Sequence, residues 1–299
     1  MVAQSKRPKA EDRPVAARQA RPKNPGAGGA EGQQAFDKRD REDIEGRRRL
    51  RAPLIYEVLR REGEEEMGRP TSSLWWSGVA AGLSISFSLL SEAILQAHLP
   101  DQPWRPLVSA LGYPVGFLIS VLGRQQLFTE NTITVVLPVA ASPTLSNFGR
   151  LARMWTIVLS ANGAGTLFAA LFCCFTPVLS PDIRAVMFDI SRHVAASSPI
   201  DLFFRAITAG FLIAAMVWLM PSAQGAEFLV VGMMTYLIGA GGFAHVVAGS
   251  FEAFMLVVTA QLDVWRAIAF FAVPALLGNI VGGTVLFTLI SHAQVAPEM

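Results

Sequence analysis

One histidine lies inside an otherwise apolar stretch of the sequence, where it could exchange protons with a solute. His245 follows the small residues 239–242 (GAGG) within the apolar stretch 228–258. Imidazole titrates near neutral pH, so a buried histidine can lend a proton to a weak-acid anion. The neutral acid then crosses an apolar constriction at less cost than its anion does. A histidine that only bonds backbone carbonyls is the alternative, and it is the favoured interpretation for a histidine considered without its motif.

A threonine follows a second interruption of the same kind. The apolar stretch 107–141 is broken at residues 123–126 (GRQQ), and Thr129 lies just beyond the break. Its hydroxyl could bond His245 or the transported solute. It could also cap a half-helix that begins near Asn131, and the two roles are compatible. Half-helix N-termini present free N–H groups to an anion.

Two asparagines and two phenylalanines are further candidate residues of the same site. Asn162 and Asn279 lie in other apolar stretches and could hold the broken loops by hydrogen bonds, with bonding between helices as an equal alternative. Phe128 and Phe243 are candidates for apolar constrictions on either side of His245. Ordinary core packing is the alternative for both.

Ionisable side chains also occur within or beside the apolar stretches. Such groups usually face the interior and pair with one another. Arg124 and Glu130 flank the first break, so we expect an internal ion pair between them. Glu92 and Glu252 have no such neighbour in the sequence. If Glu92, Glu130 and Glu252 line a pore without partners, they oppose the entry of an anion.

The pattern of reactive residues does not predict an enzyme. No catalytic triad spacing, phosphate loop or metal cluster is found, and the four histidines (His98, His193, His245 and His292) are widely scattered. Cys173 and Cys174 are adjacent within an apolar run and are expected to pack as small core residues. We therefore expect no catalytic residue, metal or cofactor.

The composition indicates a membrane protein. From residue 71 onward the chain has only eight basic residues, all arginine. Hydrophobic residues make up 52%, charged residues only 16%, and the mean hydropathy is +0.41. Apolar stretches of about 18 or more residues have the length that a bilayer requires. The sequence thus predicts an all-α polytopic membrane protein.

Six spans are predicted, and two of them are broken. They cover about residues 74–97, 107–141, 151–175, 202–220, 228–258 and 264–291. The second and fifth spans are the interrupted ones, each the middle member of a three-helix half. Interrupted segments at corresponding positions of two halves point to a transport site built on half-helices. Irregular backbone at membrane depth is tolerated only where it is buried in protein or lines a cavity.

The remaining segments are polar. Residues 1–43 are predicted to be a disordered extension, because they have few large apolar side chains. In residues 44–69 apolar side chains recur at three- and four-residue spacing among arginines. This segment is interpreted as an amphipathic helix on the cytoplasmic membrane face, with a solvated charged helix as the alternative. The membrane domain then spans 70–292, and 293–299 form a short tail. The first 70 residues hold 17 basic and 13 acidic residues, an interleaving that argues against a nucleic-acid partner.

The distribution of charge predicts the orientation. Arg150 and Arg153 lie between the second and third spans, and the basic extension precedes the first. Arginine and lysine favour the cytoplasmic side, so both termini are expected in the cytoplasm of a cell inner (plasma) membrane protein. The connection between the fourth and fifth spans should also be inside, but its only charged residue is Glu227.

Five motifs in order resemble those of the formate/nitrite transporter family. They are 127–132 (LFTENT) after the first break, 242–248 (GFAHVVA) after the second, 81–86 (AGLSIS), Trp155 with Asn162-Gly163, and 278–283 (GNIVGG). The resemblance covers about residues 70–292. It implies an aquaporin-like inverted repeat, a pore through each subunit of a homopentamer, and passage of small monovalent anions such as formate or nitrite, linked to protons. It also implies that His245 is the central pore histidine.

The chain departs from the family pattern in two places, as a divergent member would. Gly249 stands where many members have asparagine, and the entrance lysine of many members is missing, its position falling near Ser198. Arg192, His193 or Arg205 could replace that lysine as the cationic attractor.

Three functions are therefore compared. The first is a channel or transporter for small weak-acid anions, with His245 as proton donor. The second is a channel of the same architecture for neutral solutes such as water, hydrogen sulfide or an undissociated acid, which the missing lysine and the extra glutamates favour. The third is a receptor or scaffold with a vestigial pore.

Overall fold

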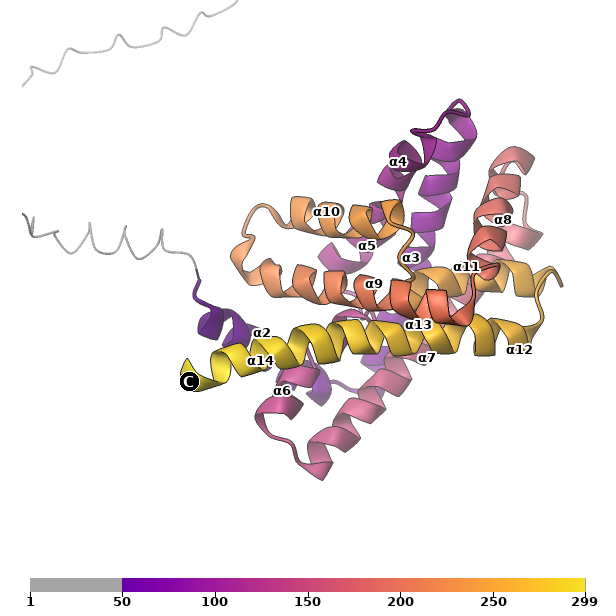
Figure 1. The fold of residues 1–299 in the computed structure, drawn as a ribbon. Helices are drawn as coiled ribbons and strands as arrows, with labels where there is room; N and C mark the ends of the chain where they lie inside the picture. The colour runs from indigo at the N-terminus through magenta and orange to yellow at the C-terminus, as the bar shows by residue number, and fades with distance from the viewer. Residues whose placement is uncertain (1–49, 299) are drawn as a thin grey trace, which may run out of the picture. The chain divides into compact units, whose positions relative to one another are not determined.

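The structure is a computed structural model that describes residues 50–298, and all its regular elements are helical (Figure 1). The predicted extension 1–43 and the first residues, 44–49, of the predicted amphipathic helix lie outside the described residues. The helices are α2 (Ala52–Gly68), α3 (Thr71–His98), α4 (Arg105–Ser109), α5 (Pro114–Leu122), α6 (Val136–Ala141), α7 (Leu145–Phe175), α8 (Pro181–Ala195), α9 (Pro199–Leu219), α10 (Glu227–Ala240), α11 (Val246–Val258), α12 (Val264–Arg266), α13 (Val273–Ile280) and α14 (Leu289–Val295).

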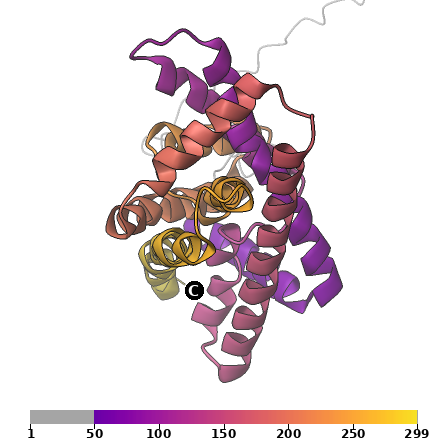
Figure 2. The ribbon, with the colours of Figure 1, turned by 90° about the vertical axis from the view of Figure 1, so that its right-hand side faces the viewer.

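Five helical stretches of the described residues are long and apolar enough to cross a membrane. They are Thr71–His98, Arg105–Leu122, Leu145–Phe175, Pro199–Ser222 and Val264–Glu298. The shorter apolar helices α6, α10 and α11 complete the second and fifth spans. The last span is continuous, because π-helical turns at Ala267–Ala272 and Val281–Thr288 join α12, α13 and α14 (Figure 2, in which this stretch is seen nearly end-on). The prediction of a polytopic all-α protein with two broken spans is confirmed.

Both breaks end their first half-helix in the same way. After α5, Arg124 adopts a left-handed backbone conformation (φ 53°), and the Gln125 N–H donates to the Ser120 carbonyl at 2.9 Å. After α10, Gly242 adopts the same conformation (φ 61°), and the Phe243 N–H bonds the carbonyl five residues back, also at 2.9 Å. This is the Schellman arrangement that terminates many helices.

Asn162 of α7 holds the first broken loop. Its Oδ1 accepts a hydrogen bond from the Phe128 N–H at 2.9 Å, and its Nδ2 donates to the Gln126 carbonyl at 2.8 Å. Nδ2 also donates to the Gly78 carbonyl of α3 at 2.8 Å. One side chain therefore ties the loop of the second span to the first span and satisfies three backbone groups.

Asn279 of α13 holds the second broken loop by the same three contacts. Its Oδ1 accepts from the Val246 N–H at 2.9 Å, and its Nδ2 donates to the Ala244 carbonyl at 3.0 Å. The third contact is to the Ala206 carbonyl of α9 at 2.8 Å. The matching contacts of the two halves confirm the predicted repeat, with the first, second and third spans corresponding to the fourth, fifth and sixth.

Glycines allow the helices to approach closely enough for these bonds. A Cβ atom added to Gly82 of α3 would collide with the backbone carbonyl of Asn162. A Cβ atom added to Gly210 of α9 would collide in the same way with the carbonyl of Asn279. Small residues at such crossings are typical of packed membrane helices.

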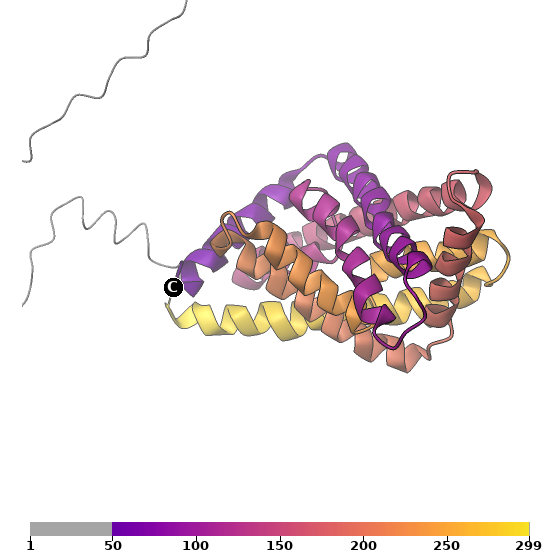
Figure 3. The same cartoon turned by 90° about the horizontal axis from the view of Figure 1, so that it is seen from above.

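Helix α2 packs on the membrane domain along one side. Ile55, Tyr56 and Leu59 are buried, whereas Leu54 and Val58 are exposed. The Tyr56 hydroxyl lies 2.7 Å from Nδ1 of His292, so α2 and the end of α14 lie side by side (Figure 3). The apolar residues of the predicted surface helix are thus divided between a protein contact and an exposed row, and its binding to a membrane surface stays a prediction.

The charge of α2 differs from the expectation of a basic helix. Ala52–Gly68 contains five glutamates but only two arginines, Arg60 and Arg61. Both arginines donate hydrogen bonds to the Glu57 carboxylate. These bonds lower the pKa of Glu57 to about 2. The arginines of this helix are therefore already engaged within it.

Two elements outside the spans were not predicted. The connection between the third and fourth spans forms the helix α8, which packs against α3 and α11. The residues predicted as a tail continue the last helix to Val295 and then form a 3-10 turn, Ala296–Glu298.

The two helix terminators predict stability changes of opposite sign. Gly242→Ala places an L side chain in the left-handed region and should lower the free energy of unfolding by about 1 kcal/mol. Its added Cβ meets no atom within 4 Å, so the cost is conformational. Arg124→Gly relieves the same strain in the first break and should raise the melting temperature in detergent. Shifts of the same sign in the two variants would contradict this account.

The asparagine contacts predict a large loss of stability. Asn279→Leu leaves the Val246 N–H and the Ala244 and Ala206 carbonyls without their partner. Each unpaired buried group costs about 1–3 kcal/mol, so the variant should lose most of its monodisperse peak in size-exclusion chromatography. Asn147→Leu, at a partly exposed position of α7, is the control and should keep that peak. Equal behaviour of the two variants would rule out a structural role for Asn279.

Candidate functional site

The two broken loops meet at His245. Its Nδ1 accepts a hydrogen bond from the Ala248 N–H at 3.2 Å, so the imidazole caps α11. Its Nε2 lies 2.7 Å from Oγ1 of Thr129 in the first loop. A backbone N–H can only donate, so Nδ1 is the acceptor, and in the neutral ring Nε2 carries the hydrogen and donates to Thr129. The side chain is 2% exposed.

Thr129 is fully buried, and its hydroxyl is directed to His245 rather than to a helix cap. The 3-10 turn Glu130–Thr132 that follows it receives no side-chain capping bond from Thr129. The hydroxyl accepts from Nε2, so its own hydrogen is available, and no described residue provides an acceptor for it. Thr129 itself lines neither of the two cavities described below.

Aromatic rings enclose the imidazole. Phe117 of α5 lies edge-on to His245, with 4.9 Å between ring centroids. Phe243 lines the same cavity as His245, and its role as a constriction stays a prediction. Phe128 instead packs against Trp155 at 5.6 Å and lines neither of the cavities described below. Phe117 was missed in the sequence, because an aromatic residue in an apolar helix gives no distinguishing signal.

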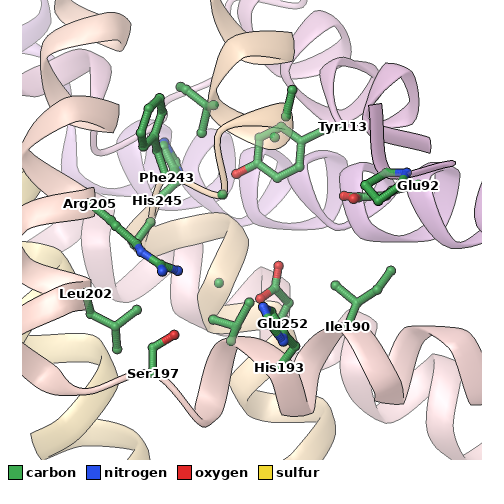
Figure 4. A pocket seen from close by; sticks show the side chains of 18 of the residues that line it. Glu92, Tyr113, Ile190, His193, Ser197, Leu202, Arg205, Phe243, His245 and Glu252 are labelled. Carbon is green, nitrogen blue, oxygen red and sulfur yellow. The ribbon is translucent and has the colours of Figure 1, made fainter. Parts of the chain in front are cut away.

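A cavity of about 490 Å³ opens on one side of His245; we call it the His245 cavity (Figure 4). Its wall combines apolar side chains with several ionisable ones. The ionisable members are Glu92, Tyr113, Asp189, His193, Arg205, His245 and Glu252.

Glu252 is the most deeply buried carboxylate of this cavity. It lies on the same face of α11 as His245 and Gly249, at helical spacing. Its side chain is 8% exposed, and Oε2 has no hydrogen-bond partner among the described residues. Gly249 leaves room for the ring of Phe271, which a Cβ atom at that position would strike. The ring therefore fills space beside the position where many family members have asparagine.

A second cavity, of about 740 Å³, lies next to α2; we call it the α2 cavity. Five carboxylates and a single cation, Arg124, line it. The carboxylates are those of Glu62, Glu65, Glu66, Glu130 and Glu227.

The predicted ion pair of Arg124 with Glu130 is not formed. The Arg124 guanidinium lies 3.8 Å from Glu62 of α2, and its side chain is 83% exposed. Glu130 Oε1 is buried without a partner among residues 50–298. The prediction considered only the break itself, whereas α2 brings a competing carboxylate to the arginine.

Gln126 connects α2 to the first loop, a role that the sequence did not reveal. Its Nε2 donates to Glu66 at 2.8 Å, and its Oε1 accepts from Asn131 Nδ2 at 3.2 Å. In the sequence, the only indication of this role is that Gln126 is a polar residue within the break.

Among the described residues no group of three His, Cys, Asp or Glu side chains is arranged to hold a metal ion.

Comparisons with known proteins agree with this architecture. The family model described as formate/nitrite transporter matches residues 53–293. The chain is 44% identical over 249 residues to the inner membrane protein YfdC of Escherichia coli (strain K12), covering 83% of this chain and 80% of that protein. It is 26% identical over 235 residues to the formate channel FocA of Haemophilus influenzae, with coverages of 70% and 82%.

Solved structures show the same fold. A pentameric formate channel with formate bound aligns with a TM-score of 0.65 at 22% identity, over 76% of this chain and 98% of that one. An ion channel of the FNT family aligns with a TM-score of 0.66 at 20% identity, over 81% and 96%. The broken spans, their asparagine contacts and the extent of these matches together show that this chain belongs to the formate/nitrite transporter family of membrane channels and transporters.

Proposed function

We propose that this protein carries small monovalent weak acids, of the formate or nitrite kind, through a pore in each subunit, and that His245 links this passage to protons. The observation that carries the proposal is the bond between His245 Nε2 and Thr129 Oγ1 at 2.7 Å. It joins the two broken loops at the wall of a cavity, and the formate channels among the similar proteins support a small-acid substrate.

The geometry favours a relay through Thr129. The proton donor is the imidazolium of His245, which forms when Nδ1 releases the cap bond of α11 and takes up a proton from the solution. The ring becomes neutral again as its Nε2 proton passes to the Thr129 hydroxyl. The Thr129 hydroxyl accepts from Nε2 and can donate its own hydrogen to the solute. Protonation converts the anion to a neutral acid, which passes the apolar surroundings of Phe117 and Phe243 at lower cost.

The assembly and orientation are part of the same proposal. The pentameric formate channel supports a homopentamer, and the name of the E. coli relative supports an inner membrane location. Helix α2 and the end of α14 are in contact, and Arg153 donates to the Arg69 carbonyl at 3.1 Å on that same side. By the positive-inside rule this side, with both termini, is cytoplasmic.

A neutral-solute channel is the second candidate, and the carboxylates favour it. Glu252 faces the His245 cavity and Glu130 faces the α2 cavity, and each has a buried oxygen without a partner among the described residues. Ionised carboxylates would repel an anion at both openings. Water or an undissociated acid would not experience this repulsion.

Uptake into proteoliposomes separates the two candidates. We expect labelled formate, nitrite or acetate to enter faster at the lower of two external pH values, with little osmotic water flow. Rapid water flow without uptake of any of the three acids would favour the neutral-solute channel. Protein-free liposomes correct for leakage of the undissociated acids.

A substitution at His245 tests the proton link. His245→Asn keeps a hydrogen-bonding side chain that can cap α11 but cannot exchange a proton near neutral pH. It should preserve folding while abolishing uptake or making it independent of the proton gradient. Thr129→Val removes the hydroxyl and should lower the uptake rate only in part, because the net contribution of one such hydrogen bond is about 1 kcal/mol. An unchanged pH profile in His245→Asn would make His245 purely structural.

A further inference from the structure

We propose that Glu252 and Arg205 form a binding site for the weak acid in the His245 cavity, and that the solute receives its proton there from Glu252. This inference rests on the proposed function and adds to it the place where the substrate first binds. Glu252 is then the first proton donor, and a solute that reaches the loops as an anion receives its proton from His245 through Thr129.

The first observation is the state of Glu252. This carboxyl is more than nine-tenths buried, lines the cavity and has an oxygen without a partner among residues 50–298. A buried polar group without a partner is costly, so its presence at a cavity wall indicates a ligand that supplies a hydrogen bond. The group needed is a donor, or an acceptor when the carboxyl is protonated.

The second observation is a cation on another wall of the same cavity. Arg205 comes from α9, whereas Glu252 comes from α11. Figure 4 shows both side chains directed into the cavity. Among the described residues Arg205 makes no ion pair and no side-chain hydrogen bond, so its guanidinium is open to a ligand. A guanidinium donates strong, charge-assisted hydrogen bonds to carboxylate-like anions.

The other ionisable groups of the cavity do not take the place of this pair. Asp189 of α8 is largely exposed and bound to Arg192 at 2.7 Å. Glu92 of α3 adds a second carboxylate beside Glu252, with Tyr113 near both. His193 of α8 is the remaining basic group, and neither α7 nor α13 contributes a residue to the lining.

A small monovalent oxyacid satisfies both partners at once. Its anion binds Arg205 through one oxygen, and a lone pair of its other oxygen takes the proton of the Glu252 carboxyl. The O–H bond of Glu252 breaks as the new O–H bond forms on the solute, and Glu252 becomes a carboxylate. The solution on that side of the membrane then returns a proton to it. The solute continues toward His245 as a neutral acid.

This arrangement reconciles an acid-lined cavity with an anionic substrate. Arg205 provides the positive charge that the missing lysine near Ser198 would otherwise supply. Ser198 itself caps α9 and donates to the Asp201 carboxylate at 2.7 Å, so it offers no cation at this position. The protonated form of Glu252 repels no anion.

Formate uptake into proteoliposomes by the full chain tests the inference. Glu252→Gln keeps size and hydrogen bonding but has no acidic proton. We expect its uptake to fall about tenfold or more at an external pH of about 8, and much less at about pH 5, where the solution itself supplies more undissociated acid. Glu252→Asp should recover part of the activity at the higher pH. Asp189→Asn, an exposed carboxylate at the same cavity, is the matched control and should change the pH profile little.

Arg205 provides an independent measurement at an exposed position. Arg205→Gln should raise the KM for formate about tenfold at the higher pH with kcat nearly unchanged, and Arg205→Lys should keep most of the affinity. If Glu252→Gln does not fold, the KM of Arg205→Gln decides, and an unchanged KM overturns the site.

The outcomes distinguish the two proposals. A wild-type protein that takes up none of the weak acids refutes the proposed function. A wild-type protein that takes up formate, with a Glu252→Gln variant whose pH profile is the same, refutes only the site at Glu252 and Arg205. An equal loss at both pH values also contradicts proton supply by Glu252.

Discussion

The fold depends on satisfying backbone groups where two helices are broken inside the bilayer. No water is available there, so each free N–H or carbonyl needs a partner within the protein. Asn162 and Asn279 meet this need with three hydrogen bonds each, to the loop and to the neighbouring span. Without them the loops would have no defined position, and neither would Thr129 or His245.

The same contacts explain why the site is built from two halves of the chain. Each asparagine fixes one loop, and the repeat brings the loops together from opposite halves of the sequence. Thr129 and His245 are 116 residues apart, yet their side chains are within hydrogen-bond distance. The pairing is asymmetric: His245 corresponds in the repeat to a leucine, Leu127, so only one half supplies a titrating group. A single histidine thus lies at the meeting point of two otherwise similar loops.

The electrostatics of the protein set a second constraint. Carboxylates outnumber cations on the walls of both cavities, an unfavourable environment for a free anion. A carboxyl group does not repel an anion when it is uncharged, and both burial and the sharing of a proton favour the uncharged form. Membership of this family and two acid-lined cavities are compatible if protons accompany the solute, as we propose. In that proposal Arg205 is the cation that binds the anion in the His245 cavity.

The sequence by itself determined the spans, the two breaks and the polar residues beside them. These are local properties: hydropathy and length identify a span, and glycine with polar residues marks where a helix ends. The sequence could not determine which partners meet, because contacts between distant segments depend on how the helices pack. The partner of Arg124 is Glu62 of α2, Phe128 packs on Trp155, and the unpartnered Glu252 shares a cavity with Arg205 of α9. Only the tertiary structure decided these, since burial and competition among charges arise when the helices come together.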